Sequence, residues 1–498
     1  MKKGIVYLVG AGPGDPGLFT VKSIDVLKSA DCIIYDYLAN NALLSQIDCE
    51  KIYVGKKGSD HTLPQDEINR LIIKKAGEGK TVVRLKGGDP FIFGRGGEEA
   101  EDLVDAGIPF SIIPGISSFY SSPAYAGIPV THRDFANAFE VITGHRRDDA
   151  SEGEDINFPE YDAHKSFIFL MGMKNLQYIA DQLINAKKFP SDTPVGIISW
   201  GTTPRQKVAI GKLTNIADAA RKEGVTSPAI IVVGKVVLLR DKLKWFDTAP
   251  LFGKKIAVTR TREQASALSK KLNELGAWVV EFPTIEIKKR DDLSELNTAL
   301  EEIAVYSWII FTSQNAVKIF FDSMKAKGMD GRNLYYSKIA CIGPATANEL
   351  RKYFIEPDLV PSEYIAEDII NEMKKIGIHD NRILIPCAAE ARQTLKEGLT
   401  ELGAEVDRIH IYDTIIPENI PEDIKDEVES ADMITFASSS TVKNFFKIFK
   451  DTKAKLACIG PVTADAVKDL GRRPDITAAE YTIDGLVEAI LKYYRKSN

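Results

Sequence analysis

The chain has 498 residues, of which 44% are hydrophobic and 27% are charged, and its formal net charge is −6. This length exceeds what one hydrophobic core supports and predicts about three domains of a globular protein. The negative charge excludes a general electrostatic attraction to nucleic acid or to an anionic membrane, so local basic residues must bind any anionic ligand.

The first residues, MKKGIVYLVGAG, pass directly into an apolar strand and a glycine turn. No apolar stretch precedes a cleavage site, and no segment has the length and apolar character of a membrane span. The cysteines are scattered: Cys32, Cys49, Cys341, Cys387 and Cys458. Their spacing is not that of metal ligands, so we expect free thiols, no metal site and a cytoplasmic protein without a membrane or nucleic-acid partner.

The first half of the chain alternates short apolar strands with amphipathic helices. Strands are predicted over 5–9, 32–35, 81–85, 111–113, 139–143, 167–171, 195–199 and 229–233, and helices over 20–29 and 64–76. This alternation predicts an α/β fold with an open, mainly parallel sheet and helices on its faces. The acidic segment 148–162 is predicted to be a mobile loop, and 241–254 is predicted to hold the main domain boundary.

The first glycine loop has the spacing of a dinucleotide-binding turn. Residues 12–17, GPGDPG, match G-x-G-x-x-G after a strand, and Asp36 ends the next strand about 20 residues later. A pyrophosphate needs backbone N–H donors, and Pro13 and Pro16 have none. The loop therefore favours a ligand without phosphate, such as a nucleoside that carries an amino acid. An NAD-dependent oxidoreductase fused to a regulatory pair of lobes is the disfavoured alternative.

The segment 84–99, RLKGGDPFIFGRGGEE, is unusually rich in glycine and follows a predicted strand. Glycine at this density is typical of a backbone that approaches a ligand closely, so we interpret the segment as a pocket wall rather than a surface turn. Asp36 and Lys56 follow neighbouring strands, where open α/β sheets bind ligands. For each, a helix cap or a solvated turn residue is the alternative.

Other polar residues of the first half are candidates for the same pocket. Ser117 and Ser118 begin a predicted helix; helix capping explains one hydroxyl, and two also suit a carboxylate or ribose contact. The basic residues that we expect to line a polyanion site are Arg84, Lys86, Arg95 and Arg133. A solvated loop is the alternative for the basic clusters.

The motifs VGAGPGDPGLFT, YDYL, VGK, RLKGGDPFIFGRGGEE, PGISS and PVTHR occur in this order over about residues 1–245. This half resembles the uroporphyrinogen-III C-methyltransferases of the tetrapyrrole methylase family. The resemblance implies a fold of two α/β subdomains, S-adenosylmethionine as cofactor, and transfer of two methyl groups to uroporphyrinogen III to give precorrin-2. Asp36 is then the proton acceptor and Lys56 the proton donor. The implied cofactor contacts are Pro13, Gly87, Gly88, Asp89, Ile92, Ser117, Ser118, Met171 and Gly201.

The second half contains an internal repeat. Segments 255–287, 308–321, 339–350 and 364–373 match segments 382–414, 433–446, 456–467 and 481–490. Two copies of one βαβα plan predict two similar α/β lobes. The chain order allows each copy to close on itself; we favour one lobe of 254–286 plus 416–498 that encloses a second lobe of 287–415.

Residues 254–498 resemble uroporphyrinogen-III synthases through VTRTREQA, FTSQNAV, CIGPATA, HIYDT, FASSSTV and CIGPVTA. The resemblance implies cyclisation of hydroxymethylbilane with inversion of ring D and no cofactor, with Tyr412 assisting departure of the hydroxyl. The residues that it places along the cleft are Thr312, Ser313, Thr346, Ser438, Ser439 and Thr463. Helix capping is the alternative role for each of these hydroxyls.

Together, the two halves predict a bifunctional enzyme on the route to sirohaem and cobalamin, because the second half makes what the first half consumes. The resemblance further implies small tetrapyrrole substrates and a homodimer formed through the first half. A non-catalytic, two-lobe module that binds a small ligand is the alternative for the second half.

Overall fold

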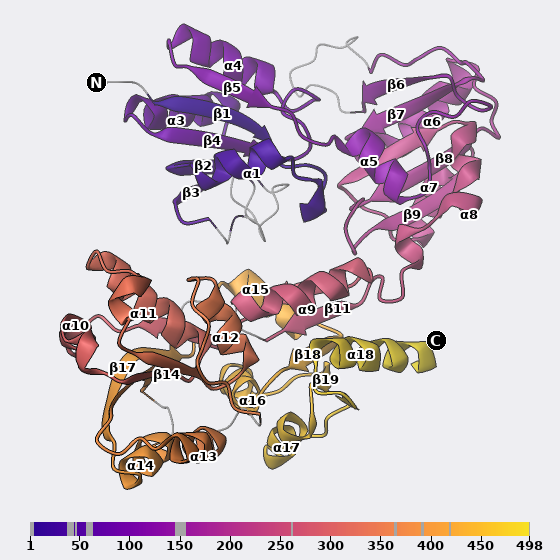
Figure 1. The fold of residues 1–498 in the computed structure, drawn as a ribbon. Helices are drawn as coiled ribbons and strands as arrows, with labels where there is room; N and C mark the ends of the chain where they lie inside the picture. The colour runs from indigo at the N-terminus through magenta and orange to yellow at the C-terminus, as the bar shows by residue number, and fades with distance from the viewer. Residues whose placement is uncertain are drawn as a thin grey trace. The chain divides into compact units, whose positions relative to one another are not determined.

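The computed structural model describes residues 4–36, 44, 47–55, 63–144, 156–259, 262–362, 366–389, 393–417 and 420–497 (Figure 1). These residues form two compact units. One contains residues 1–256, 270–279 and 490–498, and the other contains 257–269 and 280–489. Within the described part of the chain, no helix has the length and apolar character that crossing a membrane requires.

The first sheet is parallel throughout. Its strands, in spatial order, are β3 (Glu50–Tyr53), β2 (Cys32–Tyr35), β4 (Thr81–Lys86), β1 (Ile5–Gly10) and β5 (Phe110–Ile113). The helices α1 (Val21–Lys28), α3 (Gln65–Gly77) and α4 (Gly96–Asp105) flank it (Figure 1). The predicted α/β fold is confirmed here. Because the strands are parallel, the segments after β1, β2, β4 and β5 meet at one edge of the sheet.

The second sheet is mixed, which corrects the prediction of mainly parallel strands. Its order is β6 (Ala138–Thr143), β7 (Lys165–Leu170), β10 (Ala229–Val233), β8 (Pro194–Ser199) and β9 (Lys207–Lys212). Only β6 and β7 run parallel. A short turn joins β8 to β9, and a turn of that length cannot make the crossover that parallel strands need. The helices of this subdomain are α5 (Ser118–Tyr125), α6 (Leu176–Asn185) and α7 (Ile216–Lys222).

The acidic segment 148–162 is only partly described. Residues 148–155 lie outside the described part of the chain. The side chains of Ile156 and Phe158 are buried in the apolar core beside the second sheet. The predicted mobile loop therefore does not include these two residues, because burial of their apolar side chains holds them in place.

The segment that was predicted to hold the domain boundary packs against α5. It contains α8 (Arg240–Leu243) and the short helix Phe246–Thr248. The indole Nε1 of Trp245 donates a hydrogen bond to the Ala124 carbonyl oxygen at 3.1 Å, and its ring lies 5.0 Å from that of Tyr125. Arg240 forms an ion pair with Asp247. The change of pattern along 241–254 thus corresponds to a connection that is fixed to the first half.

The second half of the chain builds two sheets. One contains β12 (Trp278–Glu281), β11 (Lys255–Val258), β18 (Met433–Phe436), β19 (Lys455–Cys458) and β20 (Ile476–Thr477), in that order. The other contains β13 (Glu286–Lys289), β17 (Glu405–Ile415), β16 (Arg382–Ala388), β14 (Trp308–Phe311) and β15 (Lys338–Cys341). The first strands of this half thus share a sheet with its last strands, and the residues between them form the other sheet.

Helices surround both of these sheets. They are α9 (Arg262–Glu274), α10 (Ser294–Glu301), α11 (Gln314–Ala326), α12 (Pro344–Arg351), α13 (Ala366–Ile376), α14 (Thr394–Glu401), α15 (Glu422–Glu429), α16 (Ser439–Ile448), α17 (Pro461–Asp469) and α18 (Ile483–Ser497). The internal repeat is preserved in packing. Phe311 meets Phe320 with ring centroids 5.3 Å apart, and the equivalent Phe436 meets Phe445 at 5.5 Å.

Candidate active sites

Glycine backbones form the floor of the candidate site in the first half. Gly10, Gly88 and Gly115 follow or end three neighbouring strands at the carboxyl edge of the first sheet. A Cβ atom on Gly10 would lie 2.5 Å from the Cα atom of Gly115, and one on Gly115 would lie 2.2 Å from the Gly88 carbonyl oxygen. Gly12 and Gly88 exchange backbone hydrogen bonds of 3.2 and 2.8 Å. No side chain fits between these loops, so the floor is bare backbone.

The carboxylate of Asp89 ties two of these loops together. Its Oδ1 accepts a hydrogen bond from the Phe91 N–H at 2.8 Å, and its Oδ2 accepts one from the Gly115 N–H at 3.0 Å. Gly88 just before it has φ of +68°, a conformation that favours glycine. The side chain of Asp89 therefore shapes the floor, and the backbone of Gly87 and Gly88 remains the surface that a ligand can approach.

The two hydroxyls predicted to contact the cofactor begin α5. Ser117 is the N-cap residue, is 4% exposed, and its side chain makes no capping hydrogen bond; Ser118 is the first helical residue. The alternative that helix capping explains the Ser117 hydroxyl is therefore wrong. A Cβ atom on Gly88 would lie 4.0 Å from the Ser117 Cα and 3.9 Å from the Ser118 backbone nitrogen. The space beside Gly88 is thus bordered by a helix N-terminus with N–H groups to donate.

Large apolar side chains are exposed in the loops that follow β4 of the first sheet and β7 of the second. The exposed fractions are 53% for Phe91, 39% for Ile92, 44% for Phe93 and 50% for Met171. Phe93 and Met171 also have positive φ angles of 51° and 57°, which non-glycine residues rarely adopt. Exposed apolar side chains on strained backbone are typical of a surface that contacts a ligand.

The first glycine loop packs against the turn between β8 and β9. A Cβ atom on Gly14 would lie 2.6 Å from the Thr203 side chain. The Asp15 N–H donates a hydrogen bond to Thr202 Oγ1 at 3.2 Å, and Asp15 Oδ2 accepts one from Tyr125 Oη at 2.6 Å. Burial and the Asp15 carboxylate raise the pKa of Tyr125, so this phenol stays protonated. The loop is therefore a contact between subdomains, and its last residues begin the 3-10 helix Pro16–Leu18.

Two predicted cofactor contacts belong to the same region. Pro13 is half-buried in the first glycine loop. Gly201 is buried against α5, where a Cβ atom would lie 2.3 Å from the Cβ atom of Ser122. Close packing thus accounts for the glycine at position 201, and only its backbone can serve a ligand.

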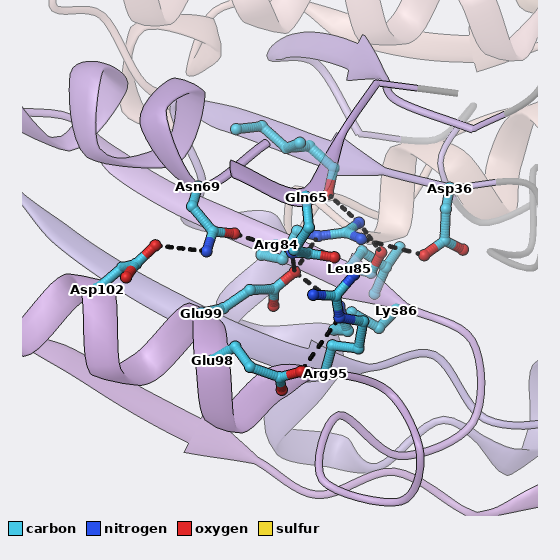
Figure 2. A network of polar contacts seen from close by, with 11 residues as sticks. Asp36, Gln65, Asn69, Arg84, Leu85, Lys86, Arg95, Glu98, Glu99 and Asp102 are labelled. Atoms are coloured by element: carbon cyan, nitrogen blue, oxygen red, sulfur yellow. Dashed lines mark hydrogen bonds and ion pairs between the residues drawn. The ribbon is translucent and has the colours of Figure 1, made fainter. Parts of the chain in front are cut away.

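A buried network of charges lies behind Asp36, and Figure 2 shows Asp36 and Glu99 on opposite sides of the Arg84 guanidinium. The Nη2 atom of Arg84 donates to Asp36 Oδ2 at 3.3 Å, and its Nε donates to Glu99 Oε1 at 3.1 Å. Lys86 Nζ donates to the same Glu99 oxygen at 2.7 Å. Asp36 ends up at the carboxyl edge of the sheet with 29% of its side chain exposed.

This network corrects the prediction that Arg84 and Lys86 contact substrate carboxylates. Arg84 is 3% exposed and Lys86 is 4% exposed, and both ion-pair with Glu99. Burial, followed by the like charge of Arg84, lowers the pKa of Lys86 despite its pairing with Glu99. Both residues lie on the same face of β4 and are buried because helices cover this strand, which the basic composition of the segment does not reveal.

The other predicted basic residues have different surroundings. Arg95 is exposed, has φ of +58°, and forms an ion pair of 3.1 Å with Glu98. Arg133 is also exposed. Lys56 lies outside the described residues. Sequence reasoning missed Glu99. The apolar residues Ala100, next to it, and Leu103, one helical turn later, are also buried and indicate that this face of α4 points inward.

In the second half, Tyr412 of β17 lies at the N-terminus of α11. Its Oη atom is 2.8 Å from Ser313 Oγ, which also accepts a hydrogen bond from the Ala316 N–H at 3.1 Å as the N-cap of the helix. Tyr412 is 5% exposed. Burial raises its pKa, and the Ser313 hydrogen bond opposes that rise. The phenol is therefore protonated at neutral pH and held in position by a fixed hydroxyl.

The remaining hydroxyls predicted to line the cleft have mixed roles. Thr312 is half-buried, and Thr346 and Thr463 occupy equivalent buried positions in the first turns of α12 and α17. Ser438 caps α16 by accepting from the Thr441 N–H at 3.3 Å. Ser439 Oγ donates to the Val462 carbonyl oxygen at 3.2 Å. Local hydrogen bonds thus account for Ser438 and Ser439, and their contact with substrate stays a prediction.

Comparison with known proteins matches two family models, one in each half of the chain. Residues 5–217 match the model of the tetrapyrrole (corrin/porphyrin) methylases, and residues 266–488 match that of uroporphyrinogen-III synthase HemD. The porphyrin biosynthesis protein HemD of Ruminiclostridium josui is 38% identical over 99% of this chain and 98% of its own length. The chain belongs to this family of fused tetrapyrrole-biosynthesis proteins. The fusion predicted from the motifs is thereby confirmed.

Other relatives have a higher sequence identity over a smaller share of the chain. The uroporphyrinogen-III C-methyltransferase of Bacillus subtilis (strain 168) is 43% identical over 71% of this chain and 72% of its own. The siroheme synthase of Hahella chejuensis is 46% identical over 49% of this chain and 52% of its own length. Among solved structures, the uroporphyrin-III C-methyltransferase of Thermus thermophilus is 37% identical over 49% of this chain and 98% of its own, with a TM-score of 0.42.

Proposed function

We propose that this bifunctional enzyme of tetrapyrrole biosynthesis cyclises hydroxymethylbilane to uroporphyrinogen III in its second half and methylates that product twice in its first half, giving precorrin-2. The relatives support the two activities, the methyltransferase and the synthase. The observation that carries the proposal for the first half is the bare backbone floor and, at the same edge of the sheet, the partly exposed carboxylate of Asp36.

The residues of the floor fit S-adenosylmethionine, the cofactor of the methyltransferase half. A floor of glycine backbone without side chains admits a flat nucleoside. The hydroxyl of Ser117 makes no helix-capping hydrogen bond and suits a ribose or carboxylate. The residues that we propose to hold the cofactor are Pro13, Gly87, Gly88, Asp89, Ile92, Ser117, Ser118, Met171 and Gly201. When bound, the cofactor supplies a methyl group on a positively charged sulfur.

The protein's own groups then position the pyrrole ring and handle its proton. Methylation makes a substituted pyrrole carbon quaternary, so the cation that forms must lose its proton from another position of the macrocycle. Asp36 is the carboxylate at the edge of the floor that we propose as the acceptor of this proton. Arg84 fixes the Asp36 carboxylate by a charge-assisted hydrogen bond. We propose Lys56 as the proton donor. The exposed Arg95 and Arg133 remain candidates for substrate carboxylates.

In the second half, we propose that Tyr412 donates a hydrogen bond to the departing hydroxyl of hydroxymethylbilane. The paired repeats supply helix N-termini, at α11, α12, α16 and α17, whose N–H groups suit the carboxylates of the substrate. Thr312, Ser313, Thr346 and Thr463 lie at or beside these N-termini. Inversion of ring D requires a protein surface that holds the linear substrate while its ends join.

From the family resemblance we also propose a homodimer formed through the first half, in the cytoplasm, on the route to sirohaem and cobalamin. The decisive experiment incubates the full chain with hydroxymethylbilane, with and without S-adenosylmethionine. We expect the type III isomer of uroporphyrinogen without the cofactor and precorrin-2 with it. Formation of only the type I isomer would refute the synthase proposal, and unmethylated type III product would refute the methyltransferase proposal.

A further inference from the structure

Glu99 is a buried acid to which the reaction outlined above gives no role. Its residue is 1% exposed, and its Oε1 atom accepts hydrogen bonds from Arg84 Nε at 3.1 Å, Lys86 Nζ at 2.7 Å and Gln65 Nε2 at 3.2 Å. Its Oε2 atom is buried without a hydrogen-bond partner in the structure. A buried ion pair is by itself weak evidence of stabilisation, so this burial calls for another explanation.

The hydrogen bonds of Arg84 leave one corner of its guanidinium for Asp36. Its Nη1 atom donates to the carbonyl oxygens of Leu85, at 3.1 Å, and Ile34, at 3.4 Å. Its Nε donates to Glu99, and Nη2 donates to Asp36 (Figure 2). A planar guanidinium that is held at Nε and Nη1 cannot rotate. The buried contacts at these two atoms therefore fix the position of Nη2 and orient the Asp36 carboxylate that is paired with it.

The balance of charges in the network also indicates that Glu99 supports the pairing of Arg84 with Asp36. Strand β4 brings two cations, Arg84 and Lys86, to the buried side of Asp36, and α4 brings Glu99. From α3, the uncharged Gln65 donates to Glu99 at 3.2 Å and to Asn69 Oδ1 at 2.8 Å, and Asn69 Nδ2 donates to Asp102 Oδ2 at 2.6 Å. Glu99 is thus the anion that balances one of two buried cations, which leaves the other paired with Asp36.

A purely helical role for Glu99 does not account for this arrangement. An acid in the first turn of a helix interacts favourably with the helix dipole, but Glu98 occupies the same turn at the exposed surface. Burial adds a desolvation cost that the dipole does not require. The inward position of Glu99 therefore serves the groups it contacts.

We propose that Glu99 is a positioning residue for the proton acceptor, holding the Arg84 guanidinium so that Nη2 orients the Asp36 carboxylate toward the ring to be deprotonated. This inference rests on the proposed role of Asp36 and assigns Glu99 no contact with substrate. Glu99 then affects the rate of methylation and leaves the binding of cofactor and substrate unchanged.

The test measures methylation of uroporphyrinogen III by the full chain carrying Glu99→Gln, which keeps the shape and one acceptor oxygen. We expect kcat to fall about tenfold, less than the loss of about a hundredfold or more for removal of a general base by Asp36→Asn. The KM for uroporphyrinogen III and the Kd for S-adenosylmethionine should stay within about twofold, since ground-state binding is untouched. Glu101→Gln, which neutralises an exposed acid of the same helix, is the matched control and should leave kcat unchanged.

A double variant separates positioning from general support of the fold. If Glu99 acts through Asp36, then Glu99→Gln slows the wild-type chain but adds no further loss to Asp36→Asn. The inference would be overturned if the losses of kcat in the two single variants added fully in the double variant. It would also be overturned if Glu99→Gln raised the Kd for the cofactor by the same factor as it lowers kcat. If Glu99→Gln does not fold, Glu99→Asp keeps the charge, and the same non-additivity is required of it. An Asp36→Asn chain with unchanged kcat would instead refute the proposed role of Asp36.

Discussion

The phenol oxygen of Tyr412 lies 2.8 Å from the hydroxyl oxygen of Ser313, across 99 residues of chain. Ser313 Oγ already accepts a hydrogen bond from the Ala316 N–H, so its own proton is available to donate to Tyr412 Oη. In that arrangement the phenol keeps its proton for a ligand. Ser313, the N-cap residue of α11, thereby also orients the Tyr412 phenol that we propose to act on the leaving hydroxyl.

Replacing Tyr412 by Phe removes the only proton that this side chain can donate. We expect the rate of uroporphyrinogen III formation from hydroxymethylbilane to fall by about a hundredfold, and Ser313→Ala to cause a smaller loss. Chromatography of the oxidised type I and type III products measures the outcome. Methylation of supplied uroporphyrinogen III serves as the internal control and should not change. A Tyr412→Phe chain with normal synthase activity would remove this residue from the mechanism.

The pH dependence of the synthase reaction follows from the same tyrosine. Burial raises the pKa of Tyr412, and an acid must be protonated to act, so activity is retained below that raised pKa and is lost as the pH rises through it. We expect no loss from tyrosine ionisation up to about pH 10. The measurement is the rate of type III product formation between pH 7 and 10, compared with the profile of Tyr412→Phe. A descending limb near neutral pH that is absent from Tyr412→Phe would contradict it.

The floor of the methyltransferase site has no room for a methyl group at Gly115. A Cβ atom there would lie 2.2 Å from the Gly88 carbonyl oxygen, so Gly115→Ala must push two loops apart. We expect a loss of stability of about 1–3 kcal/mol and at least a tenfold rise of the Kd for S-adenosylmethionine. Calorimetry measures both. Gly97→Ala is the matched control, because no atom lies within 4 Å of its added Cβ. Equal effects of Gly115→Ala and Gly97→Ala on stability and on the Kd for the cofactor would contradict the proposal that close backbone packing at Gly115 forms the cofactor site.

The carboxylate of Asp89 supports the same floor through hydrogen bonds to Phe91 and Gly115. Asp89→Ala removes both acceptors, and we expect cofactor affinity to fall about tenfold or more as the loops lose their alignment. Because Asp89 takes no proton, kcat at saturating cofactor should fall much less than in Asp36→Asn. Equilibrium binding and steady-state rates of the two variants distinguish these patterns. The reverse pattern would place Asp89 in the chemistry and not in the shape of the site.

Several features of the fold followed from local pattern. Alternating strands and helices predicted α/β architecture, and the glycines of 84–99 predicted a close approach of backbone, which Gly88 and Gly115 display. The mixed second sheet was missed because its strands are short apolar runs, which look alike whether they run parallel or antiparallel. The basic composition of 84–99 predicts that Arg84 and Lys86 contact substrate carboxylates, but both side chains are buried, and a sequence does not show which residues of a covered strand are buried.

The sequence by itself determined the two-part organisation, the internal repeat and the loops that we propose to carry the chemistry, because these depend on residue types and spacings along the chain. Only the tertiary structure decided which side chains meet. Glu99 reaches Arg84, and Tyr412 reaches Ser313, because separate elements cross at those points. Such contacts depend on how sheets and helices pack. Packing is a property of the whole folded chain, and no local pattern of residues contains it.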